Sequence, residues 1–214
     1  MLIHVSRMDS MGSDRTVVNA ARVSFAKHKD ELDGSDEKLI KYLPEHGHWT
    51  PFSHCFIQFK IDAPIFVARQ LQKHQVGLAW NEVSRRYVDN EPEFFSPDVW
   101  RRRAKDKKQG SMSEPIASQS IAYSIMKEAY DTCLKAYKRL LKMGVCPEQA
   151  RLVIPQSMFT SWYWSGSLYA FSRVCNLRLK EDAQEETRDV AQRISDHCAV
   201  EFPISWKNLV KEDK

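Results

Sequence analysis

The chain has 214 residues, of which 28% are charged and 43% hydrophobic, and its formal net charge is +4. This composition indicates a soluble chain that can bury a core. It excludes a membrane-spanning protein, because no apolar run approaches the roughly 20 residues of a membrane helix. The length and the lack of a linker predict a single domain over residues 1–214.

The amino terminus, MLIHVSRMDS, lacks the basic segment and long apolar segment of a secretory signal, so we expect a cytoplasmic protein. The five cysteines are odd in number and none belongs to a CxxC pair, which argues against a disulfide framework or a structural zinc site. The modest positive charge suits a small anionic ligand at least as well as nucleic acid.

The first 50 residues predict a strand and two helices. Residues 3–5 alternate in the manner of a strand, and Asp14 is placed to cap a helix through VVNAARVSF. Ser35 is expected to cap a second helix, which ends near Pro44 because proline disfavours helix in the residue before it.

A second strand and a helix follow. Residues 54–62 alternate apolar and polar side chains, and Pro64 opens a helix through IFVARQLQKH with Gly77 as its exit. VGLAW then reads as a short apolar turn, and NEVSRRY as loop or extended chain.

The second half is predominantly helical. We expect a basic surface insertion near residues 88–111, a long helix over 114–143 and a short helix from Pro147. MFTSWYWSGS reads as a turn, and SLYAFSRVCNL and EDAQEETRDVAQRISDHCAVEF as two further helices. Strands early and helices late predict an α+β fold with an antiparallel sheet and several long helices.

Polar side chains are grouped unusually between Arg69 and Tyr87, where an apolar VGLAW segment divides two blocks of them. Arginine offers a planar fork of donors for phosphate, and an amide side chain offers both a donor and an acceptor for the edge of a base. The stretch therefore predicts a nucleotide site. The alternative is a surface helix in which Glu82 pairs with Arg85 or Arg86.

Arg151 and Arg178 interrupt the apolar segments ARLVIP and CNLRL, where a guanidinium needs a partner. They are expected either in the same site or in buried salt bridges with Glu148 and Asp182.

Three histidines and a basic run invite other readings. His46, His48 and His54 form no HExxH or other tight ligand set, so we expect no metal. The basic residues are a solvated loop or a patch that steers an anion. They are Arg101, Arg102, Arg103, Lys105, Lys107 and Lys108.

Six segments carry a family resemblance: AARVSF, TPFSHCFIQF, APIFVARQ, NEVSRRY, ARLVIP and NLR. In this order they resemble flavin-dependent thymidylate synthases over most of the chain. That family's signature of Arg-His-Arg followed by Ser is altered, because Lys73, His74 and Gln75 replace the triplet and the spacing to Ser84 is one residue longer.

The resemblance implies two sets of site residues. The dUMP site would use Gln70, Lys73, Glu82, Val83, Ser84, Arg85, Arg86, Arg151 and Arg178, several of them from different subunits. Flavin contacts are implied for Ser24, Thr50, Lys73, His74, Gln75, Glu82, Ser167, Tyr169 and Arg173.

The implied reaction is reductive methylation of dUMP to dTMP in a homotetramer with shared active sites. Methylenetetrahydrofolate would give the one-carbon unit, and FAD reduced by NADPH would give the hydride. Arg178 is the implied catalytic residue, because its fixed charge would stabilise negative charge that spreads into the uracil ring. Ser84 would hydrogen-bond to the substrate.

Two alternatives stay open. The altered Lys73-His74-Gln75 motivates a flavin-dependent enzyme that transfers another group to a pyrimidine nucleotide. A nucleic-acid-binding module would instead use the run from Arg101 to Lys108 for phosphates and the SWYW segment for stacking.

Overall fold

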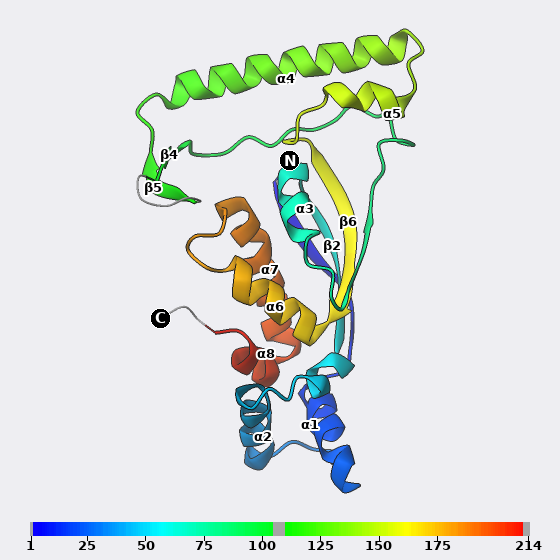
Figure 1. Cartoon of the computed structure of the whole chain (residues 1–214), viewed down its shortest axis with the longest axis vertical. Helices are drawn as coiled ribbons and strands as arrows, with labels where there is room; N and C mark the ends of the chain where they lie inside the picture. The colour runs from blue at the N-terminus through cyan, green and yellow to red at the C-terminus, as the bar shows by residue number, and fades with distance from the viewer. Residues whose placement is uncertain (1, 105–109, 212–214) are drawn as a thin grey trace.

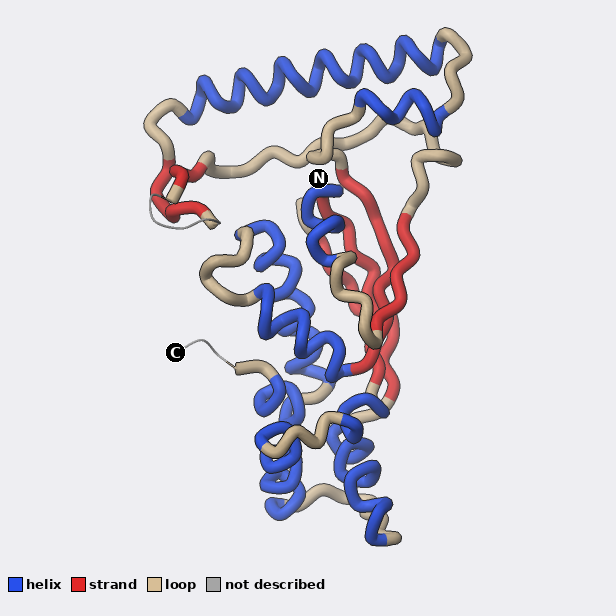
Figure 2. Tube along the Cα trace, viewed as in Figure 1, coloured by secondary structure: helices blue, strands red, loops and turns tan. Residues whose placement is uncertain are grey.

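A computed structural model describes residues 2–104 and 110–211, so the predicted basic residues Lys105, Lys107 and Lys108 lie outside the described part. A four-stranded antiparallel sheet has the order β1-β2-β6-β3, formed by His4–Met11, Phe56–Pro64, Phe159–Ser167 and Leu78–Glu82. Figures 1 and 2 show helices against one side of this sheet. The predicted α+β class is confirmed.

The helices of this fold range from single turns to a long rod. Their bounds are α1 Asp14–Arg22, α2 Gly34–Glu45, α3 Ile65–Leu71, α4 Gln119–Lys142, α5 Pro147–Ala150, α6 Leu168–Arg178, α7 Glu185–Glu201 and α8 Pro203–Leu209. Short 3-10 turns are η1 Val23–Phe25, η2 Thr50–His54 and η3 Arg151–Val153. The described helices contain none that is long and apolar enough to cross a membrane.

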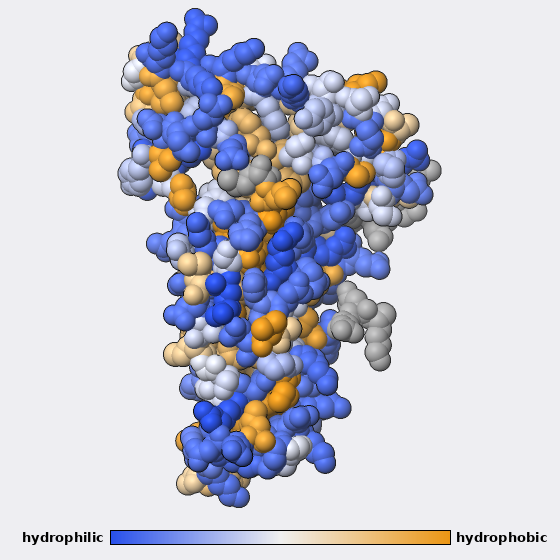
Figure 3. Space-filling view, turned by 180° about the vertical axis from the view of Figure 1, so that it is seen from behind, coloured by the Kyte–Doolittle hydropathy of each residue, from blue (hydrophilic) through white to orange (hydrophobic). Residues whose placement is uncertain are grey.

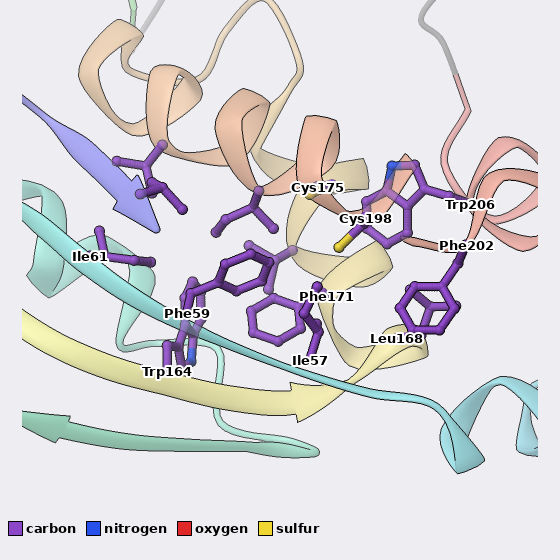
Figure 4. Close-up of a cluster of buried hydrophobic side chains, with 14 of the residues drawn as sticks. Ile57, Phe59, Ile61, Trp164, Leu168, Phe171, Cys175, Cys198, Phe202 and Trp206 are labelled. Atoms are coloured by element: carbon purple, nitrogen blue, oxygen red, sulfur yellow. The ribbon is translucent and has the colours of Figure 1, made fainter. Parts of the chain in front are cut away.

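The core forms between the sheet and α6 to α8. The predicted alternation of β2 is confirmed, since Ile57, Phe59 and Ile61 are buried and point into this core in Figure 4. Phe171 of α6 meets the Phe59 ring edge to face, with centroids 5.1 Å apart. Such aromatic pairs add stability beyond the area that they bury.

The aromatic segment MFTSWYWSGS, predicted as a turn, instead supplies β6, the strand that pairs with both β2 and β3. Trp162 and Trp164 are buried while Tyr163 between them is exposed, which is the period of two of a strand. Three consecutive aromatic residues hide this alternation in the sequence. The prediction that strands come only early is wrong for the same reason.

Glycine is required where β3 begins beside β6. A Cβ atom built on Gly166 would lie 2.5 Å from the Gly77 carbonyl oxygen, far inside van der Waals contact. Gly77 itself has φ +77°, which L side chains rarely adopt. These two glycines bring the start of β3 close to β6, so LAW of the predicted VGLAW turn is strand. Asn81 and Glu82 continue the strand, in agreement with extended chain, one of the two possibilities predicted for NEVSRRY.

The helix starts differ from the predicted caps. Ser13, not Asp14, caps α1, and its backbone N–H donates to Thr16 Oγ1 at 3.0 Å. Asp33, not Ser35, caps α2 by accepting the Ser35 N–H at 2.8 Å. The predicted helix after Pro64 ends at Leu71, well before Gly77.

α4 spans one end of the molecule, away from the helices that cover the sheet (Figure 1). Near it, β4 (Arg101–Arg103) and β5 (Ser111–Pro115) form a separate antiparallel ribbon. Arg101 is not a solvated loop residue, because its guanidinium contacts Glu185 at 2.9 Å and Glu186 at 2.7 Å. That the segment around this ribbon is an insertion stays a prediction.

Asp14 provides a test of the contact between α1, near the start of the chain, and α8, near its end. Its buried carboxylate accepts the backbone N–H groups of Ile204 and Ser205 at 2.9 and 2.8 Å, at the start of α8. Asp14→Ala leaves both donors without this acceptor, and we expect the free energy of unfolding to fall by about 1–3 kcal/mol in urea titrations. Asp9→Ala is the control, because Asp9 is exposed and accepts only from Ser10 among its described contacts. Equal losses in both variants would contradict this role.

Candidate functional site

Arg178, His74 and Gln70 meet where α3 and α6 end. The Arg178 Nε donates to His74 Nε2 at 3.0 Å, and a terminal nitrogen of the same guanidinium donates to the Gln70 carbonyl oxygen at 3.2 Å. Arg178 is the last residue of α6, and His74 lies in the turn after α3. Folding thus joins predicted residues that are more than 100 positions apart.

The bond to Arg178 fixes the protonation of His74. Arginine can only donate, so His74 Nε2 must accept and the neutral ring carries its proton on Nδ1. Burial lowers the pKa of His74, and the charges of Arg178 and Arg173 lower it further. At neutral pH the Arg178–His74 pair therefore carries its one positive charge on Arg178, beside an uncharged imidazole.

The side chain of Gln70 is held by the start of α7. Its Nε2 donates to Gln184 Oε1, and its Oε1 accepts from the Thr187 hydroxyl at 3.2 Å. A cavity of about 690 Å³ opens next to Gln70 and Arg178, and Arg101, Lys180 and Gln184 also line it. Its lining carries three cations and one carboxylate, Asp182, and although Arg101 is paired with Glu185 and Glu186, the charges of Arg178 and Lys180 with the nearby amides suit an anionic polar ligand.

A second group of predicted residues surrounds a smaller cavity of about 120 Å³ at the start of α3. Glu82, Val83, Arg85 and Arg151 line it together with Thr160. The Thr160 hydroxyl donates to Glu82 Oε1 at 2.8 Å, which fixes that carboxylate at the end of β3. Because Glu82 lies in a strand, its predicted alternative place in a surface helix is wrong.

The predicted salt bridges of Arg151 and Arg178 are also wrong. Arg151 is exposed, and its Nε donates to the backbone carbonyl of Glu148 at 3.2 Å rather than to the carboxylate. In the described ranges neither Arg151 nor Arg178 forms an ion pair. Among the described residues, no carboxylate therefore neutralises either guanidinium group. A phosphate or a pyrimidine could bind to them without first displacing an acidic side chain.

Ser84 and Arg86 lie after β3, beyond the smaller cavity's Glu82. The Arg86 Nε donates to Ser84 Oγ at 3.2 Å, and its guanidinium lies 5.0 Å from the centroid of the Tyr87 ring. Arg86 is exposed. Ser84 and Arg86 therefore offer a hydroxyl and an exposed cation to a ligand.

Several predicted flavin contacts gather near the start of α6. Trp49, next to Thr50 in sequence, stacks on Tyr169 with ring centroids 5.5 Å apart. Ser167 caps α6 by accepting the Ala170 N–H at 3.2 Å. Lys73, Gln75 and Arg173 are exposed, and Ser24 lies in η1 directly after α1, which packs beside η2.

Sequence reasoning misses the partners that hold these residues. Gln184 and Glu186 resemble the acidic start of an ordinary helix, and nothing in their spacing indicates Gln70 as a neighbour. Trp49 is also missed, and its position next to the predicted residue Thr50 is the only feature of the sequence that could have indicated it.

The segment that contains His46, His48 and His54 shows Tyr42 stacked on His46, with ring centroids 3.7 Å apart. No group of three potential metal ligands occurs among the residues that the structure describes.

Comparisons with known proteins agree over most of the chain. A family model described as "Thymidylate synthase complementing protein" matches residues 7–204. The flavin-dependent thymidylate synthase of Thermosipho africanus is 37% identical over 205 residues, which are 95% of this chain and 89% of the relative. That of Thermus thermophilus is also 37% identical, over 94% of this chain and 73% of the relative.

Solved structures give the same likeness. A UMP/dUMP methylase, PolB from Streptomyces cacaoi, bound with 5-Br dUMP, matches with a TM-score of 0.87 and 31% identity over 98% of this chain and 97% of its own. The same protein bound with 5-Br UMP matches with a TM-score of 0.86 and 29% identity over 98% of this chain and 96% of its own.

The contact between Arg178 and His74 predicts a measurable titration. In Arg178→Leu the pKa of His74 should rise, because a nearby positive charge no longer opposes protonation, although burial still holds it below the ordinary value. NMR titration of the histidine rings measures this shift. Arg193→Leu is the control, since Arg193 pairs with Asp189 on the surface. An unchanged His74 pKa in Arg178→Leu would contradict the assigned contact.

Proposed function

Because this chain belongs to the family of flavin-dependent thymidylate synthases, we propose that it catalyses the reductive methylation of dUMP to dTMP. The observation that carries the proposal is a cavity lined by Arg178 and Gln70, with His74 hydrogen-bonded to the same guanidinium. A fixed cation, a neutral imidazole and an oriented amide together match the polar edge of a uracil ring.

Arg178 is proposed to stabilise the reacting ring. Uracil is a poor nucleophile at C5 and becomes a good one only when its ring carries negative charge. A cation near the N3 and O2 edge would stabilise that charge. Arg178 remains charged at any physiological pH, so it can stabilise that charge without giving up a proton. Its bonds to His74 and to the Gln70 carbonyl hold the guanidinium in place before the substrate arrives.

The remaining predicted substrate residues are proposed to hold the nucleotide. Arg86 and Arg151 would bind the phosphate, and Ser84 would donate a hydrogen bond. Glu82 is already oriented by Thr160. Lys73, Val83 and Arg85 complete the proposed dUMP set.

FAD fits the chemistry of the residues proposed to hold it. The exposed Thr50 hydroxyl and the Trp49–Tyr169 pair offer a polar group and an aromatic face, and Lys73 and Arg173 offer exposed cations for a pyrophosphate. The flavin, reduced by NADPH, would supply a hydride, and methylenetetrahydrofolate would supply the one-carbon unit. Other proposed contacts are Ser24, His74, Gln75, Glu82 and Ser167.

We propose a homotetramer in which subunits share active sites. The cavity at Arg178 and that at Arg151 lie at opposite ends of α3, so one chain presents two separate half-sites. On α4, Ile121 and Ile125 are 60% and 63% exposed, which is costly for a helix that stays in water. Figure 3 shows further hydrophobic patches on the face of the molecule that is turned away from the viewer in Figure 1. A cytoplasmic location stays a prediction.

UMP is a second candidate substrate. The favouring observation is the likeness to a methylase whose name includes both UMP and dUMP. Competition between the two nucleotides, read as the ratio of their kcat/KM values, decides between them.

The proposed reaction is tested by a visible spectrum of the purified protein and by anaerobic NADPH oxidation with and without dUMP. We expect a flavin spectrum that bleaches on reduction, and a product of the mass of dTMP when methylenetetrahydrofolate is added. A different product mass would favour transfer of another group. Protein that stays colourless and inert after FAD is supplied, yet binds oligonucleotides in a steeply salt-dependent manner, would support the nucleic-acid alternative.

Variants of two proposed substrate residues separate their roles. Ser84→Ala should retain measurable turnover, because it removes one hydrogen bond. Arg178→Ala should lose nearly all turnover, because it removes the charge that stabilises the ring. Steady-state kcat and KM for dUMP provide the measurement, and comparable retention in both variants would overturn the assigned roles.

A further inference from the structure

A continuous chain of hydrogen bonds leads from the β4–β5 ribbon to the proposed substrate site. Arg101 donates to Glu186 Oε1 at 2.7 Å, and Gln184 Nε2 donates to Glu186 Oε2 at 2.9 Å. Gln184 Oε1 in turn accepts from Gln70 Nε2. The series of hydrogen bonds ends at the Thr187 hydroxyl, which donates to Gln70 Oε1 at 3.2 Å.

The chemistry of Glu186 dictates the direction of every bond in this chain. An ionised carboxylate has no proton to donate, so Gln184 must turn its NH₂ group toward Glu186 and its carbonyl toward Gln70. Gln70 must then turn its own NH₂ group toward Gln184. A flipped Gln70 amide would set two carbonyl oxygens against each other, and only the observed orientation satisfies all partners.

Glu186 is held in its ionised form although its side chain is only 10% exposed. Burial alone would raise the pKa of Glu186, but the hydrogen bonds from Arg101 and Gln184 outweigh burial and lower it below the ordinary value. The neighbouring residue Glu185 differs from Glu186 in its exposure and in its contacts. It also contacts Arg101, at 2.9 Å, but it is half exposed and makes no described bond to Gln184.

The orientation of the Gln70 amide matters to a pyrimidine ring. After its bonds to α7, Gln70 retains one N–H and one oxygen lone pair for a ligand. Uracil presents a donor at N3 and an acceptor at O4, whereas cytosine presents an acceptor at N3 and a donor at N4. An amide in one orientation therefore complements one of these edges, and the flipped amide complements the other.

We propose that Glu186, anchored by Arg101, is a positioning residue that locks the Gln70 amide in one orientation and so makes the site select uracil over cytosine nucleotides. The inference rests on the proposed function, in which Gln70 contacts the pyrimidine. Glu186 acts through Gln184 and does not itself touch the substrate.

The test compares Glu186→Gln with Glu185→Gln in the flavin-loaded oligomer. Each substitution removes one carboxylate from Arg101, but only the first allows Gln184 and Gln70 to flip. The readout is the ratio of the dissociation constants for dCMP and dUMP, measured by titration calorimetry, with kcat and KM for dUMP beside it. We expect Glu186→Gln to lower the ratio about tenfold, mainly by admitting dCMP, and Glu185→Gln to change it less than twofold.

Two further variants keep the result interpretable. Glu186→Asp keeps an acceptor that cannot donate, so it should restore most of the selectivity. Gln184→Met removes the amide that links Glu186 to Gln70 and leaves the contact between Glu186 and Arg101 in place, so it should weaken selectivity even if Glu186→Gln fails to fold.

Each outcome decides the matter. An unchanged ratio in both Glu186→Gln and Gln184→Met, while the wild-type protein still converts dUMP, overturns the positioning role alone. A wild-type protein that neither binds dUMP nor forms dTMP overturns the proposed function and, with it, the inference.

Discussion

The pairing of β6 with β2 is the constraint on which the rest of the structure depends. The strands are antiparallel, so α3 leaves β2 at one end of the sheet and α6 leaves β6 at the other. α3 has seven residues and α6 eleven, which gives lengths of about 10 and 16 Å. The nine residues of β2 span about 30 Å, which is close to the summed lengths of the two helices. α3 and α6 run toward each other over one face of the sheet, so their last residues lie near the middle of that face. Arg178 and His74 meet there.

This topology also determines the electrostatics of the site. A guanidinium placed at a helix end, half buried and without a carboxylate partner among the described residues, keeps its full charge for a ligand. Burial lowers the pKa of His74 and the charge of Arg178 lowers it further, so the imidazole is an acceptor rather than a competing cation. The start of α7 then adds an ordered network around Gln70. The site is thus assembled from helix ends over a rigid sheet.

The sequence predicts those parts of the fold whose pattern is local. The alternation of Ile57, Phe59 and Ile61 identifies β2, and the segment SLYAFSRVCNL identifies α6. β6 is missed because Trp162, Tyr163 and Trp164 are all aromatic, and only burial reveals that they face opposite sides. The local capping rule assigns Asp14 to the start of α1, yet Ser13 caps that helix and the Asp14 carboxylate accepts from the start of α8, about 190 residues away, which no local rule can indicate.

The site is predicted through its family resemblance more than through its spacing. Arg178 and Gln70 are 108 positions apart, and their contact follows from the pairing of β2 with β6. The roles of Gln184 and Glu186 could not be predicted, because their side chains look like an ordinary acidic helix start. Lys73 and Gln75, which depart from the family signature, lie exposed beside His74 rather than in the core, so the fold accommodates the change without repacking.

A crystal structure of the oligomer with FAD and dUMP tests the central claim most directly. The account predicts that the uracil ring lies within hydrogen-bonding distance of the Arg178 guanidinium and the Gln70 amide, with the phosphate on Arg86 and Arg151. A nucleotide bound away from the ends of α3 and α6 would contradict it.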